Sequence, residues 1–208
     1  MRKSVVLRTA VLCSLLAVLT SCIGIDSHMT IHDNGSGTLV LTYRISQIIA
    51  DLGMSSPGGS VVPLPVSHAD FDRALAATRG KVRLTKFDRS ENEKDITVHA
   101  ELTFDSVDDL AMVDCFQDAG LKWNAQDSRH EFSQVVARAP RQPLSEDSKR
   151  MLDAFFEGYN LSFSVEAPQP IKSSTLGTLS ADRRTLSYTA SIRDAMTVTQ
   201  DLVMSAQW

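Results

Sequence analysis

The sequence has little cysteine, few aromatic residues and no large excess of charge of either sign. Cys13, Cys22 and Cys115 are its only cysteines, so it cannot build the dense disulfide framework of a small secreted domain. A formal net charge of -4 argues against a dedicated nucleic-acid-binding protein. With 43% hydrophobic residues among 208, the chain can bury a core without a metal or disulfide, as ordinary globular proteins do.

The sequence motifs of the common catalytic sites are also missing. It contains no Gly-x-Ser-x-Gly, no P-loop, no His-Glu-x-x-His and no Cys-x-x-Cys. His28 and His32 are four residues apart, but on a β-strand this spacing separates them by about 13 Å, too far for one metal ion. We therefore expect a protein that is not an enzyme and that holds no cofactor and no metal.

The N-terminal residues have the features of a secretory signal peptide. Arg2, Lys3 and Arg8 make a basic start, and the apolar run over residues 10–19 is too short for a stable membrane span. The run ends in Leu-Thr-Ser followed by Cys22, which resembles the bacterial lipobox. This resemblance implies that the Cys22 thiol carries a diacylglyceryl group, that the signal is cleaved before Cys22, and that a fatty acid such as palmitate can acylate the new amino terminus.

The same features predict the domain organisation. We expect a signal peptide over residues 1–21, a lipidated tether over 22–27 and a single domain over 28–208. Each buried methylene contributes about 0.8 kcal/mol, so two or three acyl chains hold such a protein on a membrane. The membrane of a bacterial cell envelope is therefore the expected partner. Ile23 follows the cysteine, and the sequence leaves open which membrane and which side.

Cleavage of the signal would leave Cys115 as the only free thiol. It would also remove three basic residues and take the formal charge from -4 to -7. Cys115 follows apolar residues at helical spacing, and the neighbouring Asp114 and Asp118 are not groups that lower the pKa of a thiol. These features indicate a buried structural cysteine.

The remaining sequence alternates short strands, hairpin turns and a few helices. Short helices are expected over 46–52 and after the N-cap residues Ser67, Ser106 and Ser145, the second of them continuing to about Phe116. Strands mixed with helices in this order indicate an α+β fold, with a mainly antiparallel sheet of hairpins and three or four short helices. The predicted strands cover residues 28–33, 38–46, 81–88, 95–104, 120–125, 130–138, 161–166, 171–179, 184–192 and 202–208.

Charge is unevenly distributed along the chain. Residues 88–118 contain ten acidic and two basic side chains, which favours a solvated face. Just before them, Lys81, Arg83 and Thr85 share one side of a predicted strand. Lys81 and Arg83 are candidates for binding a small anionic headgroup, and a charged solvent-facing surface is the alternative.

A second candidate ligand site is apolar. A helix over 151–156 would place Phe155 and Phe156 in a wide apolar stripe, and the Pro-containing segment 61–66, with Val62, cannot join a central strand. We expect the segment to cover a groove between this helix and the sheet. The alternative is that helix and segment simply close the core.

Several strands resemble the LppM-type lipoprotein domain of mycobacteria. The resemblance rests on the hairpin over 29–45 with its Asn-Gly-Ser-Gly turn, on the strand sequence over 161–168 and on the terminal Trp208. It would cover most of residues 27–208. It implies an α+β envelope domain similar to lipid-binding modules, with affinity for membrane glycolipids. We expect no counterpart of the C-terminal membrane helix of the mycobacterial members.

Two functional hypotheses follow. The first is a membrane-anchored, non-enzymatic lipoprotein that binds an amphipathic lipid or glycolipid of the envelope. The second is an interaction lipoprotein, which scaffolds an envelope complex or faces a host.

Overall fold

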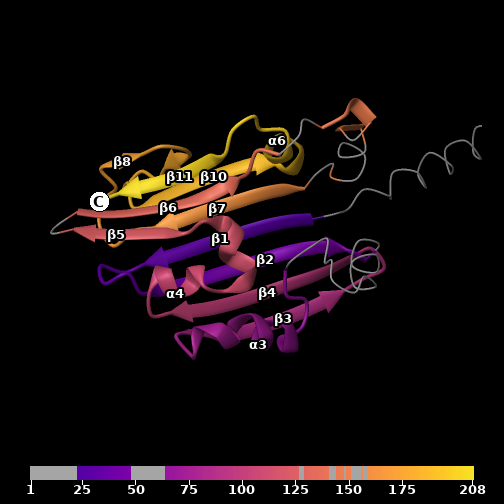
Figure 1. Ribbon diagram of the computed structural model, residues 1–208, viewed down its shortest axis with the longest axis horizontal. Coiled ribbons are helices and arrows are strands. Elements are labelled where there is room, and N and C mark those ends of the chain that lie inside the picture. The colour runs from indigo at the N-terminus through magenta and orange to yellow at the C-terminus, as the bar shows by residue number, and fades with distance from the viewer. Residues whose placement is uncertain are drawn as a thin grey trace, which may run out of the picture.

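The fold consists of two β-sheets and short helices, as a computed structural model shows (Figure 1). The larger sheet has the strand order β3-β4-β2-β1-β7-β10-β9, and the smaller has the order β5-β6-β11-β8. All the strand pairs run antiparallel except β1 with β7, so the predicted α+β class with a mainly antiparallel sheet is confirmed. The structure describes residues 23–47, 64–126, 129–140, 144–147, 149–150, 156 and 159–208.

The strands and helices have the following bounds. The strands are β1 (Ile23–Ile31), β2 (Gly37–Ser46), β3 (Val82–Glu91), β4 (Asp95–Phe104), β5 (Lys122–Gln126), β6 (Arg129–Ala137), β7 (Asn160–Glu166), β8 (Ser173–Ser174), β9 (Thr178–Leu179), β10 (Thr185–Ser191) and β11 (Leu202–Gln207). In the described part of the chain the helices are α3 (His68–Leu75), α4 (Val107–Ala111) and α6 (Ile192–Met196), with the 3-10 helices η1 (Ala76–Thr78) and η2 (Asp114–Ala119).

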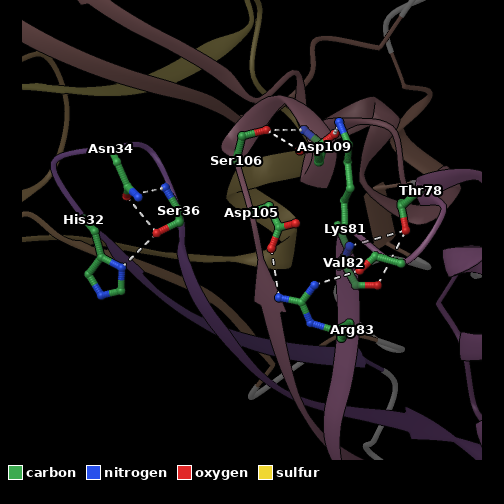
Figure 2. Close-up of polar contacts among 11 residues, drawn as sticks. His32, Asn34, Ser36, Thr78, Lys81, Val82, Arg83, Asp105, Ser106 and Asp109 are labelled. Atoms are coloured by element: carbon green, nitrogen blue, oxygen red, sulfur yellow. Dashed lines mark hydrogen bonds and ion pairs between the residues drawn. The ribbon is translucent and has the colours of Figure 1, made fainter.

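Strands β1 and β2 form the hairpin that the Asn-Gly turn predicts. In the turn, the His32 N–H donates to the Ser36 carbonyl at 2.8 Å, and the Asn34 side chain accepts from the Ser36 N–H and hydroxyl (Figure 2). Gly35 has a φ of 78°, which L-residues with a side chain rarely adopt. This local chemistry fixes the register in which Ile31 opposes Gly37.

One face of the larger sheet is apolar and the other is polar. In β4 every second residue is buried, from Ile96 to Phe104, whereas His99 and Glu101 point to the other face. The apolar face carries helices α3 and α4 and the smaller sheet, and one hydrophobic cluster joins all of them (Figure 1). The core therefore lies between the two sheets and beneath the helices.

Helix α3 begins where the sequence predicts. Ser67 is its N-cap, and it forms a capping box with Asp70, whose carboxylate accepts from the Ser67 N–H and hydroxyl. The helix buries Phe71 against Phe87 of β3, with the ring centroids 5.6 Å apart and edge to face. The cap thus determines where helix α3 begins, and packing against the sheet determines which face of the helix is buried.

Helix α4 is joined to the start of β3 through Asp109. The Ser106 hydroxyl donates to the Asp109 carboxylate at 2.6 Å, and the Lys81 ammonium donates to the same carboxylate at 2.9 Å (Figure 2). The hydrogen bond from Ser106 and the ion pair with Lys81 lower the pKa of Asp109 from its ordinary value of 3.8. The Asp109 side chain is 11% exposed, whereas the Lys81 side chain is 59% exposed, so only the carboxylate of this pair is shielded from solvent.

Asp109→Asn is expected to lower the free energy of unfolding by about 1 kcal/mol at pH 7. Because folding lowers the pKa of Asp109, the carboxylate's contribution is fully present above pH 3.8 and is lost as the pH falls through its folded-state pKa. The difference between wild type and variant should therefore shrink at pH 3. Urea unfolding at both pH values measures it. Asp108→Asn, in the same helical turn, is the control and should change stability by only a few tenths of a kcal/mol. Equal effects of the two variants would contradict this role.

Four elements differ from the sequence predictions. Helix α6 is not among the predicted helices, because residues 184–192 are expected to form one strand, which ends at Ser191 in the structure. The helix after Ser106 ends at Ala111, because Val113 takes an extended conformation with ψ of 125° before η2 begins. The predicted strand over 171–179 is two short strands, and β8 pairs in the smaller sheet while β9 pairs in the larger. Strand β1 begins at Ile23, so most of the segment expected as a tether, 22–27, is paired in the sheet.

Other predicted elements lie partly or wholly outside the described residues. Only residues 46 and 47 of the predicted helix over 46–52 are described. After Ser145, the Lys149 N–H donates to the Ser145 carbonyl at 2.9 Å, as at the start of a helix. Among the residues that the structure describes, no helix is both long and apolar enough to cross a membrane.

Candidate functional site

An apolar cavity of about 340 Å³ lies between the two sheets. Strands β1, β2 and β7 form one wall, and η2 and β6 form the other. Its volume falls within the range of about 300–1,000 Å³ that is typical of small-molecule sites. The lining is apolar apart from four polar residues, Ser27, Asp118, Gln134 and Arg138.

Strand register assembles the first wall. Ser27 of β1 lies opposite Leu41 of β2 on one side and opposite Phe163 of β7 on the other. Ile25 and Met29 share the inward face with Ser27, because side chains alternate along a strand. The short Ser27 side chain thus stands in a row of large apolar ones, which leaves space above it.

Small side chains also line the second wall. Cys115 and Ala119 come from η2, and Ala137 comes from the end of β6. Leu64 closes one side of the cavity, and the Tyr43 hydroxyl donates to the carbonyl of the next residue, Pro65. Burial raises the pKa of Tyr43, so this hydroxyl remains a donor that holds the segment beside the cavity.

Cys115 is a free thiol in the cavity wall. Burial raises its pKa to about 12, with a smaller contribution from the negative charge of Asp114. A thiol of this kind is protonated at neutral pH and is a poor nucleophile. The structure therefore supports the predicted structural role and adds a position from which the cavity can be probed.

Two buried polar side chains in the lining have unused hydrogen-bonding capacity. Ser27 is 8% exposed and Gln134 is 6% exposed. Neither the Ser27 hydroxyl nor the Gln134 amide bonds to another side chain or backbone group among the described residues. The buried side-chain polar atoms without a hydrogen-bond partner among the described residues are His130 Nδ1 and Trp208 Nε1, so the polar atoms of Ser27 and Gln134 are accessible and can bond to water or to a polar group of a ligand.

At one edge of the cavity, Arg138 joins η2 to the smaller sheet. Its Nε donates to the Asp118 carbonyl at 3.0 Å, and its Nη1 lies 3.3 Å from the Asp201 carboxylate. The guanidinium is about half exposed. The cavity therefore has an apolar interior and a charged, hydrated edge.

The predicted headgroup residues do not line this cavity. Lys81 is paired with Asp109, and Arg83 donates to the Asp105 carboxylate at 2.8 Å and to the Gly80 carbonyl at 2.7 Å (Figure 2). Both cations thus have partners, and the carboxylates come from the acidic segment 88–118. A β-bulge between Leu84 and Lys86 also breaks the alternation assumed for this strand. A headgroup site here remains a prediction.

The predicted groove lies mostly outside the described residues. Val62 and Phe155 are not described, and Phe156 is partly exposed and is absent from the cavity lining. Leu64, which belongs to the predicted covering segment 61–66, does line the cavity. The cavity found here lies between the sheets, whereas the prediction placed a groove beneath the helix.

A serine, a histidine and a glutamate meet on the polar face of the larger sheet. The Ser164 hydroxyl lies 2.8 Å from His28 Nδ1, and His28 Nε2 lies 3.6 Å from the Glu166 carboxylate. Acyl transfer by a serine also needs hydrogen-bond donors for the oxyanion. Strands β1 and β7 are interior strands, whose N–H groups are directed within the plane of the sheet. We therefore expect no hydrolase site at this cluster.

Metal binding receives no support from the described part of the chain. No group of three or more histidine, cysteine, aspartate or glutamate side chains there is arranged to hold an ion. His28 contacts Ser164 and Glu166, and His32 contacts Ser36 at 3.1 Å.

Apart from Leu64 and Cys115, the residues that form the cavity were not singled out by sequence reasoning. One local signal was available, because Ser27 falls between Ile25 and Met29 on the inward face of β1, where a large apolar residue would be expected. Phe163 of β7, which lies beside Ser27, and Gln134 of β6, which lines the other wall, are each more than a hundred residues away in the chain. No local pattern indicates that these residues line one cavity.

Comparisons with known proteins include a likeness of fold to a solved structure. No protein-family model and no curated protein matches the chain. Among solved structures, the chain is similar to the folded domain of the LppM protein of Mycobacterium tuberculosis, determined by NMR. The TM-score is 0.47 and the sequence identity is 14%, and the match covers 89% of this chain and 88% of that chain. That solved domain is of the LppM type named in the sequence resemblance.

Proposed function

We propose that this protein is a non-enzymatic lipoprotein of the bacterial cell envelope, which binds the apolar chain of an amphipathic lipid between its two sheets. The observation that carries the proposal is the cavity of about 340 Å³, with an apolar lining and two polar side chains, Ser27 and Gln134, for which no protein partner is found among the described residues. The lipobox-like sequence ending at Cys22 supports the location on a membrane.

The lining accounts for affinity. Each methylene transferred from water into such a cavity contributes about 0.8 kcal/mol. Ser27 and Gln134 can bond a carbonyl or hydroxyl group of the ligand, and Arg138 stands at the edge where a headgroup would meet water. This is the usual plan of a lipid site, with many apolar contacts and a few polar groups that fix the orientation.

Ala119→Phe is expected to weaken lipid binding at least tenfold, because the new ring fills the cavity beside Cys115. Binding of a fluorescent fatty acid to residues 22–208 carrying Cys22→Ser, and therefore without acyl chains, measures the effect. Gln117→Phe is the matched control, since Gln117 lies in the same 3-10 helix but is exposed and does not line the cavity. The Gln117→Phe protein should bind the fatty acid with the same affinity as the protein without a substitution in η2.

Reactivity of Cys115 gives an independent readout. A bound chain should slow the reaction of this thiol with a maleimide in the parent protein, and the Gln117→Phe control should keep that protection. Absence of saturable binding for fatty acids, lysophospholipids and phospholipids alike would refute the lipid-binding role. The interaction lipoprotein would then be the remaining hypothesis.

A further inference from the structure

The fold begins immediately after the residue that we propose is lipidated. Strand β1 starts at Ile23, which is paired with Ile45 of β2. Adjacent Cα atoms are only 3.80 Å apart, so no flexible spacer separates Cys22 from the sheet. Acyl chains on Cys22 would therefore hold one particular end of the domain at the membrane.

The same end of the domain carries an exposed apolar side chain. Strand β7 starts beside β1, with Leu161 opposite Ile25, and Asn160 of β7 is paired with Ser191 at the end of β10. Helix α6 begins directly after Ser191, and Figure 1 shows it at the end of the molecule where β1 starts. Its last residue, Met196, is 40% exposed and is one of three exposed large hydrophobic residues in the described chain, the others being Met112 and Val203.

We propose that this end of the domain, marked by Ile23 and Met196, rests on the surface of the lipid bilayer. The inference rests on the proposed lipidation of Cys22. The partner is the lipid surface itself, because the covalent anchor fixes which end approaches it and Met196 presents apolar surface there. A side chain in such a position enters the boundary between headgroups and acyl chains, about 5–10 Å deep.

This orientation places the cavity close to the membrane. Ile25, in the cavity lining, is three residues from Cys22, which corresponds to about 10 Å along a strand. Arg138 follows the end of β6, the strand whose other end is bonded to Trp208 at the opposite end of the molecule. A lipid could thus pass from the bilayer in which the protein is anchored to the cavity over a short path.

The opposite end carries both tryptophans of the chain. The Trp123 and Trp208 rings are 5.4 Å apart, and Trp123 lies against Gly35 in the turn between β1 and β2. Strand β1 places that turn about 26 Å from Ile23, or eight residues at the rise of a strand. The natural tryptophans therefore form a built-in reference far from the proposed contact.

Quenching of tryptophan by brominated lipids tests the orientation. The lipidated protein, residues 22–208, is reconstituted into phosphatidylcholine vesicles whose acyl chains carry bromine near the headgroup. Met196→Trp should lose most of its added emission, and the wild type should lose little. Ala181→Trp is the matched control, because Ala181 is exposed in the turn before β10, whose first residue pairs with Glu166 at the far end of β7. Its added emission should be retained.

Flotation of the same vesicles distinguishes failure of the proposed lipid anchor from failure of the proposed orientation. If the protein does not float with the vesicles, the lipid anchor is refuted and the orientation with it. If the protein floats, but Ala181→Trp is quenched as strongly as Met196→Trp, or neither is quenched, the orientation alone is overturned. Thermal unfolding of each variant in detergent confirms that the new tryptophan has left the fold intact.

Discussion

Cys22→Ser is expected to release the protein from the membrane. The lipobox-like sequence would direct acylation to the Cys22 thiol, and serine offers no thiol to modify. Two or three acyl chains give effectively permanent membrane binding, so their loss should shift nearly all of the protein to the aqueous phase. Detergent phase partitioning of cells labelled with radioactive palmitate measures both the location and the lipid.

Cys115, the only other thiol expected after signal cleavage, provides the control for this experiment. Cys115 lies in the cavity wall, so Cys115→Ser should keep both the label and the membrane location. Equal palmitate labelling of the Cys22→Ser protein and the wild type would contradict the lipoprotein assignment. It would also remove the basis for the orientation proposed above.

Gly37→Ala is expected to be the most damaging single substitution in the fold. A Cβ atom at this position would lie 2.0 Å from the carbonyl oxygen of Thr30 and 2.7 Å from the Phe104 ring. Gly37 is held between Ile31 of β1 and Phe104 of β4, so the backbone cannot move away without breaking a strand pair. We expect a loss of more than about 3 kcal/mol in the free energy of unfolding.

Gly80→Ala separates this crowding from the ordinary cost of replacing a glycine. Gly80 has a φ of 81°, but no atom lies within 4 Å of the position that a Cβ would take. Its replacement should cost only about 1–2 kcal/mol, through backbone strain. Urea unfolding followed by tryptophan fluorescence compares the two variants. Equal losses would show that crowding at Gly37 is relieved by a shift of the strands.

Much of the local structure could be predicted because its causes are local. The Asn-Gly turn and the alternation of apolar residues define the β1–β2 hairpin, and Ser67 with Asp70 defines the start of α3. The helix after Ser106 was predicted too long, because the extended conformation at Val113 lets Phe116 enter the core. No local sequence pattern indicates the stabilisation that is gained when Phe116 is buried.

The candidate site could be predicted only in small part. Leu64 lies in the segment expected to cover an apolar site, but that site was predicted beneath the helix over 151–156, and Cys115, expected to be buried, is partly exposed in the cavity wall. The parallel pairing of β1 with β7 brings Phe163 beside Ser27, which lies 136 residues earlier in the chain. Register between such distant strands depends on the packing of the whole sheet, so the cavity has no signature in either strand alone.

The sequence by itself predicts an envelope location from a lipobox-like signal, and it determined the building blocks of this protein: hairpins, helix caps and an apolar inward face on the strands. Those features act over a few residues, through turn conformations and the alternation of side chains along a strand. Only the tertiary structure decided that two sheets face each other, that Ser27 and Gln134 remain unpaired between them, and that Lys81 is paired with Asp109. Each of these outcomes depends on which distant surfaces pack together, because burial and pairing are properties of the assembled core.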